Sequence, residues 1–260
     1  MSEDPRRFDV GRVSIHLNHA PPVYDPGGPV AFVGDLPDGA EGGFLTKAET
    51  EAARRGAVLM VVQCPVAAEA SEALLRESGY TFASSWYSGS LIAFAAFSDT
   101  VSPASSVRTA TAADVPRLLE IGERKREQYE AFSPIFWKKA PVARETFAPF
   151  VTSQIENEKN IALVFEVNGD IRGYIIAQCG NPADGYVDDY TVADPAADWP
   201  TVGASLLAEA GRQAQARGVS AFTIVTGHAD DPKRAVVEEL GFTLGKNWLV
   251  KPLRQEVNEP

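Results

Sequence analysis

Two adjacent aspartates in a strand-like segment are the first candidates for chemistry. Asp188 and Asp189 lie within the apolar and aromatic run 186–192. A carboxylate held beside a reacting group can act as a general base. Because successive side chains of a strand point to opposite faces, only one of the two can face a given site, and Asp188 shares its face with Tyr186 and Tyr190. Asp188 is therefore the first choice and Asp189 the second, with two solvated aspartates as the alternative.

A short loop that leads into a predicted helix is the second candidate, this time for binding. Residues 198–203 precede a helix over 203–217, and the first N–H groups of a helix attract anions. The amides at this position belong to Val202, Gly203, Ala204 and Ser205. Asp198 brings a carboxylate into the same loop, which disfavours an anion unless the side chain points away. The alternative is a simple junction in which Gly203 permits close packing.

The histidines and cysteines do not predict a metal site. Coordination in proteins needs three or four converging ligands. The chain offers three histidines and two cysteines, in no zinc-like spacing: His16, His19, His228, Cys64 and Cys179. Two cysteines are also too few for a disulfide framework. We therefore expect no metal cofactor.

The composition predicts a folded protein and excludes some classes of partner. Hydrophobic residues make up 45% of the 260 residues and charged residues 23%, which is ordinary for a globular protein. The net charge of −11 argues against binding of nucleic acid, because no surplus of Lys and Arg is available for phosphates. The first thirty residues hold no apolar signal-peptide core, and no apolar run is long enough to span a bilayer. These features predict a cytoplasmic protein with no membrane association.

Apolar periodicity and glycine stops predict a mixed order of helices and strands in two successive parts. The first part is predicted to hold strands at 12–17, 30–33 and 57–62, helices at 45–55 and 67–77, and extended segments at 80–84 and 87–97. Residues 98–106 have the composition of a linker. The second part is predicted to hold strands at 107–109, 162–167, 171–178, 186–192, 221–225, 242–244 and 248–250, and helices after Thr111 and at 143–157, 203–217 and 232–240.

Two short signals fix local geometry in the second part. Thr111 and Asp114 have the spacing of a capping box, in which each side chain satisfies a free N–H at a helix start. Asn168 and Gly169 stand between two apolar runs and predict a tight antiparallel hairpin.

The two parts repeat one another at a separation of 162 residues. With this shift and no gap, Gly56 matches Gly218, Gly79 matches Gly241, and the apolar run 57–62 matches 219–224. The same register aligns further residues: Arg55 with Arg217, Glu77 with Glu239, Thr81 with Thr243, and Trp86 with Trp248. Self-similarity of this kind predicts a duplicated fold. The alternative is that any protein built of helix, glycine and strand shows some such register.

The second part resembles the GCN5-related N-acetyltransferase superfamily. The resemblance rests on the order of its elements and on four stretches: VRTATAADVPRLLEI, VFEVNGDIRGYIIA, VADPAADWPTVGASLLAEAGRQAQARG and EELGF. It covers about residues 105–253, whereas residues 30–97 resemble only the C-terminal half of the family. The resemblance implies an α/β (α+β) fold with a mixed, largely antiparallel sheet flanked by helices, here duplicated. It also implies that residues 1–99 form a truncated, degenerate domain and residues 105–260 an acetyltransferase domain.

The resemblance implies acetyl-CoA as co-substrate. The family's Arg/Gln-x-x-Gly-x-Gly/Ala loop, whose amides hold the coenzyme's pyrophosphate, falls on residues 198–203. Gly203 is retained, but Asp198 stands where a cation is expected and Thr201 where glycine is expected. The coenzyme-binding residues implied are Val192, Thr201, Val202, Gly203, Ala204 and Ser205.

The resemblance also implies transfer of an acetyl group by direct attack of an amine on the thioester. Asp188 or Asp189 would be the base, whereas the tyrosine that often protonates the thiolate is replaced by Val237. Residues that would line the acceptor site, with a place in the core as the alternative, are Tyr129, Phe136, Trp137 and Tyr190. The acceptor expected is a small-molecule amine or a peptide N-terminus. The expected assembly is an intramolecular pseudo-dimer, as a monomer or homodimer, and the alternative function is a non-catalytic binding or regulatory module of the same fold.

Overall fold

A computed structural model describes residues 6–37, 39–91, 107–181 and 183–253 of the chain. The predicted linker 98–106 and the end of the predicted segment 87–97 lie outside the described residues. The chain forms two compact units, and each is assembled from separated stretches. Unit 1 comprises Met1–Ser85, Tyr129–Ala143 and Lys246–Pro260, and unit 2 comprises Trp86–Gln128 and Arg144–Gly245.

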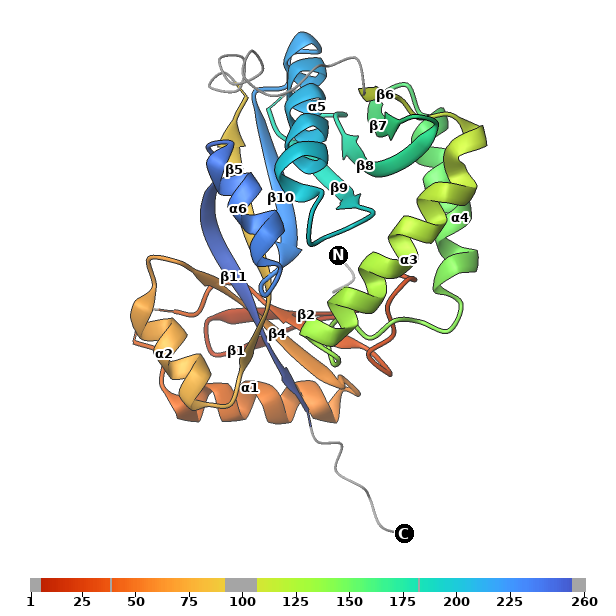
Figure 1. Ribbon diagram of the computed structural model, residues 1–260. Coiled ribbons are helices and arrows are strands. Elements are labelled where there is room, and N and C mark those ends of the chain that lie inside the picture. The colour runs from red at the N-terminus through yellow and green to blue at the C-terminus, as the bar shows by residue number, and fades with distance from the viewer. Residues whose placement is uncertain (1–5, 38, 92–106, 182, 254–260) are drawn as a thin grey trace. The chain divides into compact units, whose positions relative to one another are not determined.

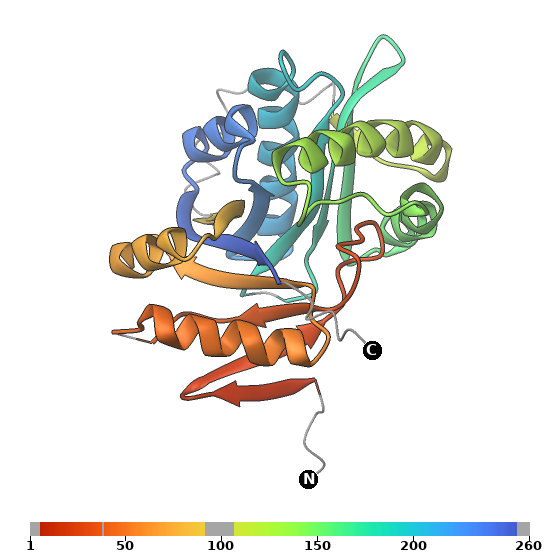
Figure 2. The ribbon, with the colours of Figure 1, turned by 90° about the horizontal axis from the view of Figure 1, so that it is seen from below.

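Unit 1 is a mixed sheet covered by helices. Its strands follow the order β1 (Arg7–Val10), β2 (Val13–Asn18), β3 (Val30–Val33), β4 (Leu59–Pro65) and the C-terminal part of β11 (Thr243–Pro252). Only β3 and β4 are parallel, and the other neighbouring pairs are antiparallel. The helices are α1 (Gly42–Arg54) and α2 (Glu69–Glu77). Figure 2 shows α1 running along the strands of this unit, against which it buries Leu45, Ala48 and Ala52.

Unit 2 is a mixed sheet between helices. Its strands follow the order β5 (Thr81–Ser90, of which only the C-terminal part from Trp86 belongs to this unit), β10 (Ala221–Gly227), β9 (Gly185–Val192), β8 (Asp170–Gln178), β7 (Asn160–Val167) and β6 (Val107–Thr109). Strands β9 and β10 are parallel, and β6 to β9 are antiparallel. The helices are α3 (Val115–Phe132), α4 (Ala143–Glu156), α5 (Ala204–Ala216) and α6 (Asp231–Glu239). In Figure 1, α5 lies in front of β9 and β10, and Figure 2 shows the strands between α5 on one side and α3 and α4 on the other.

Both local signals have the predicted geometry. The β7–β8 hairpin turns at Asn168 and Gly169, whose φ angles of 52° and 83° suit the mirror-image turn that joins twisted strands. The capping box at Thr111 and Asp114 is present and leads through a 3₁₀ turn (η3, Ala112–Asp114) into α3. Arg108 binds the same Asp114 carboxylate at 2.8 Å, so strand β6 is held to the helix start.

The predicted shift of 162 residues relates four consecutive elements. It carries α1 onto α5, β4 onto β10, α2 onto α6 and β5 onto β11, with the same bounds in each case. The helix-ending glycines also correspond, since Gly56 and Gly79 have φ of 87° and Gly218 and Gly241 have φ of 84°. Ser85 donates a hydrogen bond of 2.8 Å to Asn247, its counterpart under the same shift. The mixed, helix-flanked sheet predicted from the sequence is therefore present, and its elements repeat.

The structure also departs from the predicted elements. Strand β1 was not predicted, and the two segments predicted around residues 242–250 are one continuous strand, β11. Each unit takes a strand from the other half of the sequence, because β11 pairs with β4 in unit 1 and β5 neighbours β10 in unit 2. The predicted domains, residues 1–99 and 105–260, are defined by the sequence repeat, whereas the two units are defined by compactness. These domain bounds remain a prediction.

Candidate functional site

The aspartate pair lies at an irregularity of strand β9. In the β8–β9 ladder Ile176 pairs with Asp189, whereas the next residue, Ala177, pairs with Val187. Asp188 is therefore an extra residue of β9 with no partner of its own in this ladder, which is the pattern of a β-bulge. Bulges redirect side chains and occur often beside active sites.

The bulge changes which side chains share a face. Paired residues of an antiparallel ladder point to the same side, so Tyr186, opposite Gln178, faces the same way as Asp189. Tyr190, opposite Ile175, faces the other way and joins the apolar cluster under α5. The expected common face of Asp188, Tyr186 and Tyr190 is therefore wrong, because strand alternation fails at an inserted residue.

Asp189 is buried in a network that reaches it from α3 and β8. It forms an ion pair with Lys125, and Tyr174 Oη donates to its Oδ2 at 3.0 Å. Burial alone would raise the pKa of Asp189, but Lys125, with smaller contributions from Arg126 and Lys233, lowers it below the ordinary value. A carboxylate kept ionised by this network is a poor proton acceptor, so it suits a role in holding the site together.

Asp188 has the opposite electrostatic setting. Its carboxylate is half-buried and accepts a 2.6 Å hydrogen bond from Gln178 Nε2. Burial raises the pKa of Asp188 above its ordinary value, and repulsion from Asp189 adds to this, although Gln178 and Lys125 oppose it. A carboxylate with a raised pKa binds a proton more readily, which is the property of a general base near neutral pH.

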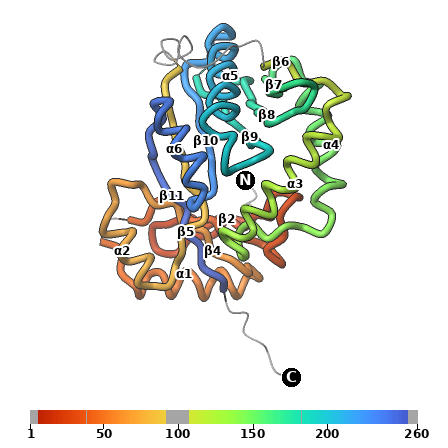
Figure 3. Tube along the Cα trace, in the orientation of Figure 1, coloured from red at the N-terminus to blue at the C-terminus, as the bar shows by residue number. Residues whose placement is uncertain are grey.

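The loop before α5 is closed by its own hydrogen bonds. Residues Trp199–Gly203 form a π-helical turn, η4, that runs directly into α5, and the tube in Figure 3 follows this path. The carbonyl of Asp198 accepts from the amides of Val202 at 2.7 Å and Gly203 at 3.2 Å. The amide of Ala204 donates to the carbonyls of Trp199 and Thr201. Three of the four amides expected to be available to an anion are therefore engaged within the chain.

The charge of Asp198 is neutralised by an arginine from outside the loop. Arg172 on β8 contacts both of its carboxylate oxygens at 3.0 Å, and the amide of Asp194 donates to Oδ2 at 3.1 Å. The side chain thus closes the loop at its start. Its cation comes from a neighbouring strand, a pairing that the order of residues along the loop could not reveal.

Gly203 lies against an aromatic side chain. A Cβ atom at this position would stand 2.5 Å from Cε3 of Trp199 and 3.1 Å from Oη of Tyr190. The Trp199 and Tyr190 rings meet edge to face at 5.0 Å. Close packing is thus one reason for glycine here, as the alternative interpretation of the loop expected.

Replacing Gly203 with alanine should lower the free energy of unfolding by about 1–3 kcal/mol, because the added methyl group overpacks the Trp199 ring. Urea unfolding measures this loss. The matched control is Gly180→Ala, since a Cβ atom at Gly180 meets nothing within 4 Å. An unchanged or increased stability of Gly203→Ala would show that Trp199 moves aside freely.

Lys233 is a functional candidate that the sequence did not reveal. It lies on α6, is 1% exposed, and donates from Nζ to the backbone carbonyl of Tyr190 at 3.0 Å. The pairing of β9 with β10 ends at Val187 and Ile224 although both strands continue, so this carbonyl takes its hydrogen bond from a lysine. Burial lowers the pKa of Lys233 to about 7, and Lys125 adds to this against the attraction of Asp230 and Asp189.

Three buried polar atoms around the start of α5 have no hydrogen-bond partner within the described residues. They are Tyr190 Oη, Trp199 Nε1 and Ser205 Oγ. Lys233 Nζ lies above two of the same residues, 5.1 Å from the Tyr190 ring and 5.6 Å from the Trp199 ring. Buried polar atoms are nearly always paired in folded proteins, so this concentration marks the place as unusual.

Comparison with solved structures places this architecture among known folds. A functionally unknown conserved protein from Staphylococcus epidermidis is similar at a TM-score of 0.59 and 13% identity, over 98% of this chain and 94% of that one. A GCN5-related N-acetyltransferase from Sphaerobacter thermophilus is similar at a TM-score of 0.59 and 16% identity, over 93% of this chain and 77% of that one.

A tandem protein of the same fold, from the clavulanic acid biosynthesis pathway, is similar at a TM-score of 0.54 and 14% identity, over 93% of this chain and 79% of that one. The chain has the fold of the GCN5-related N-acetyltransferases. The resemblance stated from the sequence is thereby confirmed at the level of fold. No protein-family model and no curated protein matches the sequence.

The site residues that the sequence resemblance implied do not all lie in one unit. Asp188, Asp189 and Tyr190 belong to unit 2, as do all six implied coenzyme-binding residues, among which Val192 ends β9 and Thr201 is exposed in η4. The remaining acceptor-site residues, Tyr129, Phe136 and Trp137, belong to unit 1, where they form an aromatic group with ring centroids 4.5–5.4 Å apart.

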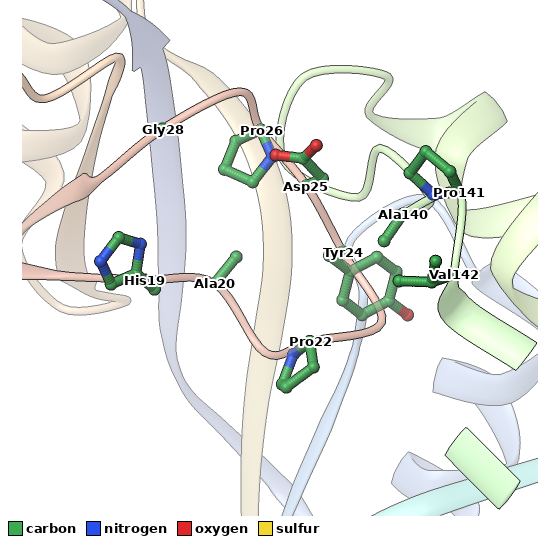
Figure 4. A pocket seen from close by; sticks show the side chains of 10 residues that line it. All are labelled: His19, Ala20, Pro22, Tyr24, Asp25, Pro26, Gly28, Ala140, Pro141 and Val142. Atoms are coloured by element: carbon green, nitrogen blue, oxygen red, sulfur yellow. The ribbon is translucent and has the colours of Figure 1, made fainter. Parts of the chain in front are cut away.

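The same aromatic segment borders a cavity of unit 1. Ala140, Pro141 and Val142 form one wall of this space of about 280 Å³. The other lining residues come from the stretch between β2 and β3, as Figure 4 shows: His19, Ala20, Pro22, Tyr24, Asp25, Pro26 and Gly28. The Tyr24 ring packs edge to face on Trp137, with ring centroids 4.9 Å apart, so Trp137 contacts a residue that lines the cavity.

Within residues 6–37, 39–91, 107–181 and 183–253, no group of three metal-ligating side chains comes together. Nor does any helix of these ranges combine the length and apolar character needed to cross a bilayer.

Proposed function

We propose that the chain is an acyl-CoA-dependent N-acyltransferase that moves an acetyl group from acetyl-CoA to an amine. The observation that carries the proposal is the bulge of β9, which presents a half-buried carboxylate of raised pKa, Asp188, within an acetyltransferase fold. The acceptor class proposed is a small-molecule amine or a peptide N-terminus.

In this proposal the two aspartates divide the work. Asp188 accepts a proton from the ammonium form of the acceptor, directly or through water, so that the neutral nitrogen can attack the thioester carbonyl. The carbon–sulfur bond then breaks, and the coenzyme A thiolate leaves as a thiol with the second proton that the nitrogen gives up. Asp189 stays ionised and, through Lys125 and Tyr174, joins α3 and β8 to β9. The same network fixes the bulge that carries Asp188.

The start of α5 is the proposed coenzyme side of the site. Helix α5 has 13 residues, so the positive end of its dipole favours a phosphate group there. Ser205 lies in its first turn with a buried hydroxyl that has no partner among the described residues. Acetyl-CoA supplies the activated acyl group, and the chain supplies the proton acceptor and the anion-binding surface.

The second candidate is a non-catalytic binding or regulatory module of the same fold. A specific observation favours it, namely that the amides of Val202, Gly203 and Ala204 already donate within the chain. Trp199 also occupies the space that Gly203 leaves open. A module that never binds coenzyme would keep this arrangement permanently.

Calorimetric titration of the full chain with acetyl-CoA separates the two candidates. Binding that saturates in the micromolar to millimolar range supports the acyltransferase, and the acceptor is then sought by screening amines for thiol release. Absence of binding at millimolar acetyl-CoA would leave the non-catalytic module as the function.

Replacing Asp188 with asparagine should lower kcat by a factor of about 10²–10⁴, the usual contribution of a general base. The Kd for acetyl-CoA should stay within about twofold, because Asp188 lies on β9 and not at the start of α5. Steady-state kinetics with calorimetry measure both quantities. Asp184→Asn, an exposed aspartate just before β9, is the control and should retain full activity. An unchanged kcat in Asp188→Asn would remove this residue from the mechanism.

A further inference from the structure

The space before α5 in unit 2 is filled by side chains of the chain itself. Trp199 is 2% exposed and packs on the backbone of Gly203 and the ring of Tyr190. Lys233 reaches the same place from α6, with its ammonium group beside both rings. Three elements, β9, η4 and α6, therefore converge on one indole ring.

The polar atoms at this place do not fit a permanent core. Tyr190 Oη and Ser205 Oγ are buried without partners in the part of the chain that is described, and so is Nε1 of Trp199 itself. Loss of water by a hydroxyl or indole N–H without a compensating hydrogen bond is unfavourable. If the only role of this place were to bury Trp199, apolar side chains would line it. Hydroxyl groups are expected instead if a polar ligand takes the place of Trp199.

The positive charge beside Trp199 comes from α6, because the loop before α5 supplies none. The stretch 194–205 contains two aspartates and no basic residue. The nearby Arg172 is bound to Asp198, so it contributes no free charge. Lys233 lies beside the Trp199 ring and donates from Nζ to the backbone carbonyl of Tyr190, and the carboxylates that attract it are Asp230 and Asp189.

The turn that carries Trp199 is suited to rearrangement. A π-helical turn is rare, occurs mostly as a single turn joined to an α-helix, and is frequent at functional sites. Pro200 follows Trp199 directly and cannot donate a backbone hydrogen bond, so residues 199–200 can leave the helix with few bonds lost. Their departure would also free the amide of Ala204 from the carbonyl of Trp199.

We propose that Trp199 is a built-in plug of the coenzyme channel, and that Lys233, Tyr190 and Ser205 contact the anionic acyl-CoA once Trp199 has moved out. This inference rests on the proposed function and adds the residues that decide coenzyme binding. In this proposal the arrangement with Trp199 packed on Gly203 and Tyr190 is the closed state. Opening exchanges the indole for the coenzyme, and Lys233 supplies the positive charge that the loop lacks.

The test is acetyl-CoA binding by the full-length chain and its variants. Trp199→Ala removes the plug and should bind at least tenfold more tightly than the wild type, since no opening step opposes binding. Trp199→Phe keeps a smaller plug and should bind with an intermediate affinity. If Trp199→Ala unfolds near the assay temperature, Trp199→Leu, which leaves a smaller cavity, replaces it.

Kinetics give a second and independent readout. In stopped-flow mixing, the observed binding rate of the wild type should reach a plateau as acetyl-CoA increases, because opening limits it. The rate for Trp199→Ala should rise linearly over the same range. Lys233→Met in the Trp199→Ala background should weaken binding at least tenfold, whereas Lys47→Met, on the exposed face of α1, should leave it unchanged.

The outcomes separate the plug from the proposed function. Fast binding by the wild type without a plateau, together with no gain in Trp199→Ala, overturns the plug while the acyltransferase stands. Absence of binding by the wild type and by Trp199→Ala at millimolar acetyl-CoA overturns both. Unchanged binding in Lys233→Met removes Lys233 from the site.

Discussion

Replacing Lys233 with methionine should stabilise the protein, and the gain should be largest below pH 7. Burial lowers the pKa of Lys233 to about 7 from 10.5. At neutral pH the folded protein must therefore either bury a charged ammonium group or release the proton of Lys233. Methionine fills a similar volume and carries no charge, and the gain must exceed the cost of about 1–3 kcal/mol for leaving the Tyr190 carbonyl without its hydrogen bond from Lys233. Removal of a buried charge in favour of a well-packed apolar side chain is often stabilising.

The dependence on pH follows from the direction of the shift. Between pH 7 and about 10.5 the unfolded chain keeps the lysine protonated while the folded chain does not, so wild-type stability rises with pH across this window. Below pH 7 the full cost of burying the charge is present. The advantage of Lys233→Met should therefore be constant below pH 7 and shrink as the pH rises above 7, by about 1.4 kcal/mol for each pH unit.

Urea unfolding of both proteins at pH 6, 7, 8 and 9 measures this difference. The groups that face Lys233 are Asp230, Asp189 and Lys125, and they are present in both proteins. Lys47→Met controls for the general effect of removing a lysine. A stability difference that does not change with pH, or a destabilised variant at every pH, would contradict the burial of a titrating lysine.

Separating the chain within residues 92–106 should abolish the stability of both pieces. A fragment of residues 1–95 lacks β11, so β4 loses the antiparallel partner that covers it from Leu59 to Pro65. It also loses Leu249 and Val250 from the cores of unit 1. An uncovered, apolar, formerly central strand promotes aggregation.

The other piece, residues 106–260, lacks β5. Tyr87 and Leu91 belong to the main core of unit 2, and Tyr87 Oη donates to Glu238 at 2.6 Å and accepts from Arg234 at 2.9 Å. We expect neither fragment alone to show a cooperative transition in circular dichroism, and we expect co-refolding of the two to restore one. The matched control is the folded chain cleaved at the same place, which should stay associated in gel filtration. A soluble 1–95 fragment that unfolds cooperatively would contradict the need for the exchanged strand.

The repeat made the architecture predictable. Helix ends at Gly56, Gly79, Gly218 and Gly241 follow from the freedom of glycine at positive φ, and apolar periodicity places the elements between them. Strand β1 was missed because the segment Arg7–Val10 has four residues, alternates charge with apolar side chains and is polar on its outer face. The exchange of β5 and β11 was missed because a strand's pattern does not identify its partner.

The candidate site was predictable only in part. The positions of Asp188 and Gly203 followed from the resemblance, but the bulge at Asp188 depends on how β8 and β9 align, which no single segment encodes. Lys233 lies in the stretch DPKRAVVEE, where a lysine is typical of an exposed helix face. Its burial results from the parting of β9 and β10, and so it could be recognised only in three dimensions.

The pairing of β4 with β11 also bears on how the protein is made. During synthesis, residues 59–65 leave the ribosome long before residues 246–252, so unit 1 waits for β11 while all the residues between the two strands are being added. Contacts between such distant segments slow folding, and a waiting apolar strand is exposed to aggregation. We therefore expect unit 1 to complete its fold only after residues 246–252 have left the ribosome, and unit 1 to be the part of the newly made chain that chaperones bind.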